Sequence, residues 1–341
     1  MVERGPEAEE RQPEDAFTLA DASVSSGEAE AAVRDLFGVE GQAQPLTSER
    51  DINFRIRARD GVQYILKIAN SAEQAATIEF QNAALRRLET GAPDIPTPRL
   101  MRTREGGDWG RYDKRITRLL TWLEGPLMHE RPRTRAMRCD LGRLHAGLHA
   151  ALSGLSAPAS AEPLLWDLQH TARLERLLPY IASDKRNLVQ CALDRFNTRV
   201  APVLSQLPKQ VIHNDLNPHN VLVSESGEAV CGIIDFGDLV HAPRICDVAI
   251  AAAYHVRGTD NPFDDAADYV EAYHAVSPLS DEERHILTDL IVSRMAMSTL
   301  ISTWRAGLHP DNSAYILRNA PSAWAGLEAI APGDLRLEIL S

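Results

Sequence analysis

The chain has 341 residues, of which 44% are hydrophobic and 25% are charged. These proportions are those of an ordinary globular protein, and they exclude collagen-like, low-complexity and fully disordered chains. The length suffices for one large domain or for two smaller ones around a sizeable core. The formal net charge of −12 argues against a general binder of nucleic acid or of an anionic membrane.

The cysteines and the apolar runs of the sequence indicate the cellular compartment. The cysteines lie in apolar stretches without C-x-x-C spacing, which predicts small buried side chains in a reducing compartment rather than disulfides or zinc ligands. The first 16 residues lack the apolar core of a signal peptide, and apolar runs such as 248–254 are too short to span a bilayer. We therefore expect a soluble, cytoplasmic protein without a membrane partner. The cysteines are Cys139, Cys191, Cys231 and Cys246.

The first part of the chain predicts a small α+β unit behind an acidic tail. Residues 1–16 hold six acids against two arginines, so we expect a disordered tail. Ser25 and Glu28 have capping-box spacing, and Asp60-Gly61 is a strong hairpin signal. In chain order, the predicted elements are a helix between Ser25 and Gly38, strands over 52–57 and 62–69, a helix over 73–89 and a strand over 115–122.

Beyond residue 126 the chain is mostly helical. Apolar side chains recur at helical spacing, and one compact β segment over 211–235 has Ser226-Gly227 as its turn. The sequence therefore predicts an N-lobe over 17–123 and a C-lobe over 124–341. The predicted helices of the C-lobe cover 136–152, 164–182, 187–204, 262–276 and 281–305.

Two loops carry the most informative residues. Residues 213–220 read HNDLNPHN, and 232–238 read GIIDFGD after one hairpin, so Asp215, Asn220 and Asp235 are expected at the same end of that hairpin. Three oxygen ligands so placed suit a hard divalent cation, Mg²⁺ above all, with a proton acceptor beside it. The spacing is also that of the catalytic loop and D-F-G aspartate of protein kinases. Asx turns and a strand-end cap are the plain structural alternative, but they do not explain the joint spacing.

Five segments between about residues 45 and 255 carry a family resemblance, namely 64–68, 141–145, 213–220, 234–238 and 247–249. Together they resemble the aminoglycoside phosphotransferase and choline kinase-like family of small-molecule kinases. The tripeptide at 53–55 and residues 235–242 look most like the hydroxylysine kinase-like branch, and type II homoserine kinases are similar in pattern. The resemblance implies an α+β, bilobal, protein-kinase-like fold. Its small N-lobe, an antiparallel sheet plus a helix, binds the nucleotide, and the larger, mainly helical C-lobe holds the catalytic loop, the metal site and the acceptor pocket.

The resemblance assigns roles to these residues. Asp215 is the catalytic base for the acceptor hydroxyl, and Asn220 and Asp235 hold Mg²⁺ against the phosphates of ATP or GTP. Asp238 either faces the acceptor and binds its ammonium group or completes a turn. Trp304, in the C-terminal helical region, is a candidate for the wall of the acceptor pocket.

Lys67 is the lysine placed to meet a phosphate. Only four lysines occur, and Lys67 alone lies inside an apolar strand, where it needs an anionic partner unless it is a solubilising edge-strand lysine. The resemblance implies that it contacts the α- and β-phosphates. Glu79 on the next helix is the expected ion-pair partner, with Gln81 as the competing position.

The remaining nucleotide contacts are less specific. No glycine-rich loop precedes Lys67, and no lysine follows a glycine, which excludes a Walker A motif. A polar loop takes its place, in which Ser48 and Asn53 either bind phosphate or form a plain turn. The resemblance places the adenine against backbone groups of the lobe connector, near Thr121 and Leu123.

The histidines near these motifs are expected to have structural roles. His145 and His149 are four apart on a helix, but they lack the glutamate of a zincin motif, so we expect a packed helical face. His213 is expected to orient the catalytic loop by hydrogen bonding. Asp247 is expected to cap the apolar helix that follows it and, by the resemblance, to brace the catalytic loop.

The sequence thus predicts an ATP- or GTP-dependent kinase that phosphorylates the hydroxyl of a small amine or amino acid, hydroxylysine-like acceptors first. An aminoglycoside or homoserine kinase is the alternative within the class. A catalytically silent, nucleotide-binding module is the alternative outside it, and the intact set of Lys67, Asp215, Asn220 and Asp235 argues against that module. Nucleic-acid partners are not expected, and the oligomeric state stays open.

Overall fold

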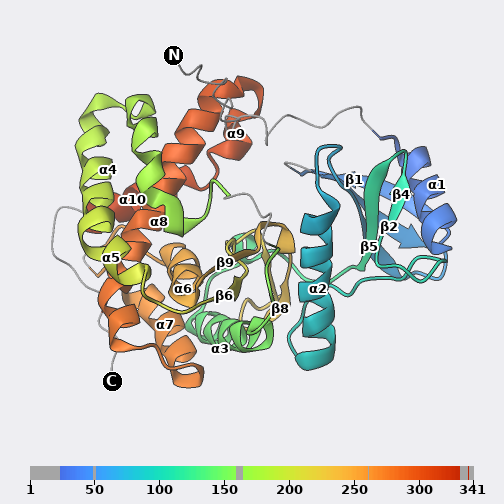
Figure 1. The fold of residues 1–341 in the computed structure, drawn as a ribbon, viewed down its shortest axis with the longest axis horizontal. Helices are drawn as coiled ribbons and strands as arrows, with labels where there is room; N and C mark the ends of the chain where they lie inside the picture. Colours follow the sequence, from blue (N-terminus) through green and yellow to red (C-terminus); the bar gives the residue numbers. More distant parts are fainter. Residues whose placement is uncertain (1–23, 49–50, 159–163, 260, 331–336, 338–341) are drawn as a thin grey trace, which may run out of the picture. The chain divides into compact units, whose positions relative to one another are not determined.

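The computed structural model describes residues 24–48, 51–158, 164–259, 261–330 and 337 (Figure 1). These residues form two compact units. The N-terminal unit consists of the described residues up to Asn82 together with Arg99–Trp122. The C-terminal unit consists of Ala83–Pro98 and the described residues from Leu123 on. The predicted acidic tail over 1–16 lies outside the described residues.

An antiparallel sheet with the strand order β1-β2-β3-β5-β4 forms the N-terminal unit. Apolar residues three and four apart on α1, Ala29, Ala32 and Val33, share a core with Phe54 and Leu66 of the sheet. This unit contains α1 (Ser26–Phe37), β1 (Gly41–Leu46), β2 (Ile52–Ala58), β3 (Gln63–Ile68), the first part of α2 (Ala75–Gly91), β4 (Gly110–Tyr112) and β5 (Arg115–Thr121).

The local signals of this unit are confirmed. Ser25 and Glu28 form the capping box of α1, and Gly38 ends the helix with a φ of 72°. The Asp60-Gly61 turn joins β2 to β3, and the Asp60 carboxylate accepts the N–H of Val62 at 3.0 Å. Strands β1 and β4 were not predicted, because β1 contains a proline and β4 has only 3 residues.

The C-terminal unit consists mainly of helices around two short antiparallel ribbons, β6-β9 and β7-β8. Its elements are η2 (Met128–Glu130), α3 (Arg135–Leu152), η3 (Leu168–Tyr180), α4 (Ser183–Arg195), η4 (Phe196–Val200), α5 (Ala201–Leu204), β6 (Lys209–Ile212), β7 (Val221–Val223), β8 (Val230–Ile233), η5 (Phe236–Asp238), β9 (Val240–Pro243), α6 (Arg244–Ala253), α7 (Asp264–Val276), α8 (Asp281–Leu308), η6 (Pro310–Asn312), α9 (Ser313–Ile316) and α10 (Ala320–Ile330).

Two predicted helices of this unit depart from α-helical geometry. The stretch predicted over 164–182 forms the 3₁₀ segment η3, with Pro179 inside it. The helix predicted over 187–204 is α-helical only to Arg195, and a π-helical turn then precedes α5. Pro202 has no N–H for a regular hydrogen-bond ladder, which accounts for the irregular turn before it. Helix α10 was not predicted.

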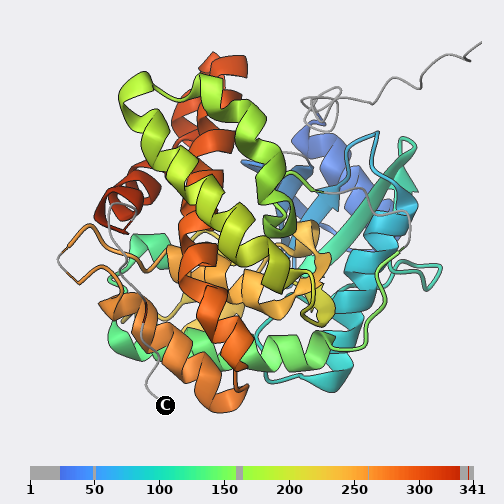
Figure 2. The same cartoon turned by 60° about the vertical axis from the view of Figure 1, so that its left-hand side comes forward.

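Helix α8 runs through the middle of the C-terminal unit, beside α4, α6 and α10 (Figures 1 and 2). By length and composition alone its 28 residues could cross a membrane, but 94% of its most apolar window is buried inside the protein. This is the burial of a core helix.

Glycine at position 142 allows α3 to pack closely on α7. A Cβ there would lie 2.3 Å from the carbonyl oxygen of Tyr269 and 2.9 Å from the backbone nitrogen of Tyr273. Both distances are shorter than any normal contact, so only glycine fits. The close approach brings His145 and His149 of α3 within reach of the two tyrosine hydroxyls.

All four cysteines are free. Cys246 is buried, as predicted, and Cys139 and Cys231 are half-buried. Cys191 is exposed on α4, so the prediction of burial is wrong for this residue. Its neighbours Leu193 and Ala192 occupy the buried face of that helix instead.

Candidate active site

Asp247 of α6 and Ile234 fix the loop between β6 and β7. The Asp247 carboxylate accepts the backbone N–H of His213 at 2.9 Å and that of Asn214 at 2.8 Å. Nε2 of His213 lies 3.0 Å from the carbonyl oxygen of Ile234, so His213 orients the loop by hydrogen bonding as expected. The N–H of Ile234 in turn donates to the carbonyl oxygen of Asn220 at 2.9 Å. The loop is therefore tied to the end of β8.

Two residues of this region adopt the left-handed backbone conformation without being glycine. Asn214 has a φ of 65°, and Asp235 has a φ of 62°. Such a conformation costs on the order of 1 kcal/mol or more, and it persists only where surrounding contacts impose it. Asn214 is also buried, and neither polar atom of its side-chain amide has a hydrogen-bond partner. Strain and unsatisfied polar groups thus collect next to Asp215.

The Asp215 carboxylate is held by three donors. Its Oδ2 accepts the side-chain amide N–H groups of Asn217 at 2.8 Å and of Asn220 at 2.7 Å. Its Oδ1 lies 3.3 Å from Nη2 of Arg294 on α8. One oxygen is therefore fixed by two amides, whereas the other faces a single guanidinium.

Burial, and after it the neighbouring Asp238 carboxylate, raise the pKa of Asp215 to about 7. The Arg294 guanidinium and the Asn217 amide act against that rise. The Asp215 side chain still has 24% of its surface exposed. An accessible carboxyl with a pKa near neutrality is suited to accept a proton from a substrate hydroxyl.

Asn220 and Asp235 offer oxygen donors beside this carboxylate. Asn220 uses its Nδ2 on Asp215, which leaves its Oδ1 as a carbonyl ligand. Asp235 follows β8 directly, and its side chain is exposed. Amide and carboxylate oxygens are the donors that a hard divalent cation prefers, so the residues present fit such an ion.

In the N-terminal unit, Lys67 lies opposite Asn53 in the register of β2 and β3. Its Nζ lies 3.9 Å from a carboxylate oxygen of Asp51, and both side chains are mostly buried. Glu79 is exposed on α2, whereas Gln81 is buried. The structure thus pairs Lys67 with Asp51 and not with Glu79, because Asp51 directly precedes β2, whose first residues lie opposite the end of β3 that holds Lys67.

The other predicted nucleotide contacts have local roles. The Ser48 hydroxyl donates to the carbonyl oxygen of Asp51, which directly precedes β2. The Asn53 side-chain oxygen is buried without a hydrogen-bond partner. The hydroxyl of Thr121 accepts the N–H of Arg99 at 2.9 Å. Leu123 belongs to the C-terminal unit and packs against Gly232 of β8.

A fully buried network lies behind the catalytic loop. His145 and His149 each place Nε2 3.0 Å from the same Asp247 oxygen that accepts the His213 N–H. Their Nδ1 atoms lie 2.6 Å from the hydroxyl of Tyr269 and 2.7 Å from that of Tyr273. Both imidazoles are thus held by hydrogen bonds on each side, in agreement with the expected packed face.

This network corrects the expectation that Asp247 caps its helix. Asp247 lies inside the first turn of α6, and Pro243 is the residue at the N-cap. The histidines and the loop N–H groups stabilise the ionised Asp247, so its pKa is well below the usual range despite burial. Because Asp247 lies in the first turn of the helix and not at the N-cap, its carboxylate reaches the catalytic loop.

Arg294 and Trp166 were not found from the sequence. The guanidinium of Arg294 lies 5.1 Å from the ring centroid of Trp166. Trp304 is buried near the C-terminal end of α8. It lies about 15 Å further along the helix axis than Arg294. The available signal was a single arginine within a helical stretch, 290–301, that holds no other charged residue.

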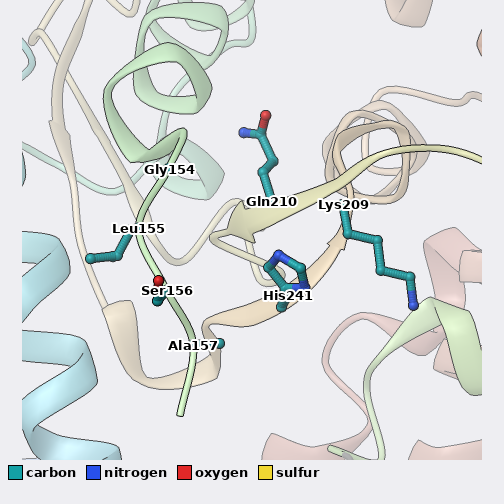
Figure 3. Close-up of a pocket in the computed structure, with 7 residues that line it drawn as sticks. All are labelled: Gly154, Leu155, Ser156, Ala157, Lys209, Gln210 and His241. Carbon is teal, nitrogen blue, oxygen red and sulfur yellow. The ribbon is translucent and has the colours of Figure 1, made fainter. Parts of the chain in front are cut away.

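A separate polar pocket lies beside β6 and β9 (Figure 3). Its lining includes Lys209, Gln210 and His241 from these strands and Gly154–Ala157 after α3. None of the predicted site residues lines it.

The Asp215 carboxylate is held in a rigid loop that also carries Asn220, and Asp235 follows after the next hairpin. This site belongs to a phosphotransferase that acts on small-molecule hydroxyl groups. Residues 42–285 match the family described as "Phosphotransferase enzyme family". The chain belongs to this family.

The relatives of this chain include small-molecule kinases that match most of its length. Hydroxylysine kinase of Mus musculus is 30% identical over 336 residues, covering 90% of this chain and 89% of the mouse protein. Homoserine kinase of Methylobacillus glycogenes is 26% identical over 254 residues, covering 73% of this chain and 74% of that enzyme.

A solved structure, that of a microcompartment-associated aminopropanol kinase, has the same fold. Its TM-score is 0.70 at 20% identity, over 89% of this chain and 97% of that one. This likeness confirms the α+β, protein-kinase-like fold.

Proposed function

We propose that the protein transfers the γ-phosphoryl group of Mg²⁺-bound ATP or GTP to the hydroxyl of a small amine or amino acid. Hydroxylysine-like compounds are the first candidates for this acceptor. The observation that carries this proposal is Asp215, a mostly buried but accessible carboxylate with a pKa raised to about 7, fixed beside Asn220 and Asp235. The similarity to hydroxylysine kinases over 90% of the chain supports the choice of acceptor.

In the proposed reaction, the acceptor oxygen attacks the γ-phosphorus and forms the new P–O bond, while the bond from that phosphorus to the nucleoside diphosphate breaks. Asp215 orients the hydroxyl and accepts its proton; a positioned base of this kind contributes about 10²–10⁴-fold to the rate. Asn220 and Asp235 would hold Mg²⁺, which neutralises charge on the phosphates when bound. Lys67 would contact the α- and β-phosphates.

Homoserine is the second candidate acceptor, because the match to homoserine kinase covers 73% of this chain. A silent nucleotide-binding module is disfavoured, since every residue that the chemistry needs is present. Cytoplasmic localisation stays a prediction.

The test is an assay of nucleoside diphosphate release with Mg·ATP and Mg·GTP against hydroxylysine, homoserine, amino alcohols and aminoglycosides. We expect acceptor-dependent release by the wild type and loss of at least about 10²-fold for Asp215→Asn. Binding of nucleotide without acceptor-dependent turnover, with no difference between wild type and Asp215→Asn, would show that the protein is not this enzyme.

A further inference from the structure

Arg294 is a buried cation with unused hydrogen-bond donors. Only 2% of the residue is exposed, although it lies on the central helix of its unit. Nη2 serves two partners, Asp215 Oδ1 at 3.3 Å and the Tyr254 hydroxyl at 3.1 Å. Nη1 meets only the sulfur of Met297 at 3.9 Å, and Nε has no hydrogen-bond partner. A buried guanidinium with unpartnered N–H groups requires a further hydrogen-bond acceptor.

The surroundings of Arg294 indicate where that acceptor would lie. Arg294 lines a small pocket together with Tyr254, Ser298 and Asn319. The indole of Trp166 lies near the guanidinium on another side. The pocket has polar groups from Tyr254, Ser298 and Asn319 beside Arg294, and the Arg294 guanidinium connects it to the Asp215 carboxylate through Nη2.

The charges around Asp215 match a zwitterion. Asp238 is close enough to raise the pKa of both Asp215 and Arg294. If Asp215 serves the hydroxyl and Asp235 the metal, the anion Asp238 and the cation Arg294 remain beside them. An ammonium group complements the first, and a carboxylate complements the second.

From this geometry we infer that Arg294 binds the carboxylate of the acceptor, so that the enzyme selects amino acids over amines that lack a carboxylate. The inference rests on the proposed function and narrows its substrate class. Nε and Nη1 point to opposite sides of the guanidinium, and either one can donate a hydrogen bond to a carboxylate while Nη2 keeps its contact with Asp215. A polycationic aminoglycoside or a simple amino alcohol would leave these donors unused and would place like charges together.

The experiment compares matched acceptors. Hydroxylysine and homoserine are each assayed beside the amino alcohol that results from loss of the carboxylate, with wild type, Arg294→Gln and Arg294→Lys. We expect the wild type to favour the amino acid by about 10²-fold or more in kcat/KM, because a site built for a polar group rejects the analogue without it. Arg294→Gln should reduce that ratio about 10²-fold, and Arg294→Lys should be intermediate because it keeps the charge but not the planar guanidinium.

The ratio separates carboxylate binding from a role in orienting Asp215. A merely positioning Arg294 would slow both members of each pair equally in Arg294→Gln, and that result would overturn the inference while the kinase function stands. Equal or better phosphorylation of the amino alcohol by the wild type would overturn it as well. Absence of phosphorylation of every acceptor by the wild type would instead overturn the proposed function, and the inference with it.

A matched substitution on the same helix controls for general effects. Arg284 pairs with Asp281 near the start of α8 and is about one-third exposed. Arg284→Gln should leave the ratio unchanged. Thermal unfolding and Mg·nucleotide binding of each variant show that the fold and the nucleotide site are intact.

Discussion

The acid stability of the protein is expected to depend on His149. This imidazole is fully buried between Asp247 and Tyr273, and burial lowers its pKa from 6.5 to about 4. Between these two values the unfolded chain binds a proton that the folded protein does not bind, so the free energy of unfolding falls as the pH falls. Relative to pH 7.5, the loss from this group is about 2 kcal/mol at pH 5, and it approaches about 3 kcal/mol below pH 4.

Urea unfolding of wild type and His149→Gln at pH 7.5 and at pH 5 measures this contribution. Glutamine can still donate to Asp247 and accept from Tyr273, but it does not titrate. The wild type should lose about 2 kcal/mol more than His149→Gln on acidification. Other buried histidines, such as His255 with a pKa lowered to about 3, are common to both proteins and cancel in the difference. The same pH dependence in both would refute the assignment of a neutral, buried His149.

Three further predictions concern packing and nucleotide binding. Gly142→Ala should lower the free energy of unfolding by about 1–3 kcal/mol, because its Cβ would lie 2.3 Å from a backbone oxygen of α7. Gly147→Ala, whose nearest atom is 3.4 Å away, is the control on the same helix; equal effects in urea unfolding would contradict the packing argument. Asp235→Ala should abolish the metal dependence of nucleotide binding in calorimetry, and an unchanged affinity for Mg·ATP would remove Asp235 from the metal site. Lys67→Ala should raise the KM for nucleotide by about 10-fold or more, in line with loss of a charged contact, whereas Lys185→Ala should not; equal KM values would show that Lys67 does not meet the phosphates.

The parts that the sequence predicts well are those in which neighbours along the chain determine the structure. The capping box at Ser25 and the Asp60-Gly61 hairpin depend on residues within a few positions of one another. The same holds for the loop with Asp215 and Asn220, whose contacts with each other span five residues. Spacing alone therefore brings these groups together.

Long-range packing decides the rest. Arg294 lies 79 residues from Asp215 along the chain, and no local pattern connects them. Lys67 pairs with Asp51 rather than with Glu79, because the register of β2 and β3 places Asp51 beside it. Asp247 has the sequence context of a helix cap, but the start of α6 lies at Arg244, so the carboxylate turns to the catalytic loop instead. In each case the tertiary arrangement, and not the local sequence, decides which side chain makes the contact.

The role proposed for Asp215 is to serve phosphoryl transfer to the hydroxyl of a small amino acid. Mass spectrometry and phosphorus NMR of hydroxylysine, after incubation with Mg·ATP and either wild type or Asp215→Asn, would detect this transfer. We expect an O-phosphorylated product that forms with the wild type and is reduced at least about 10²-fold with Asp215→Asn. Equal yields of the phosphate ester from the two proteins would contradict it.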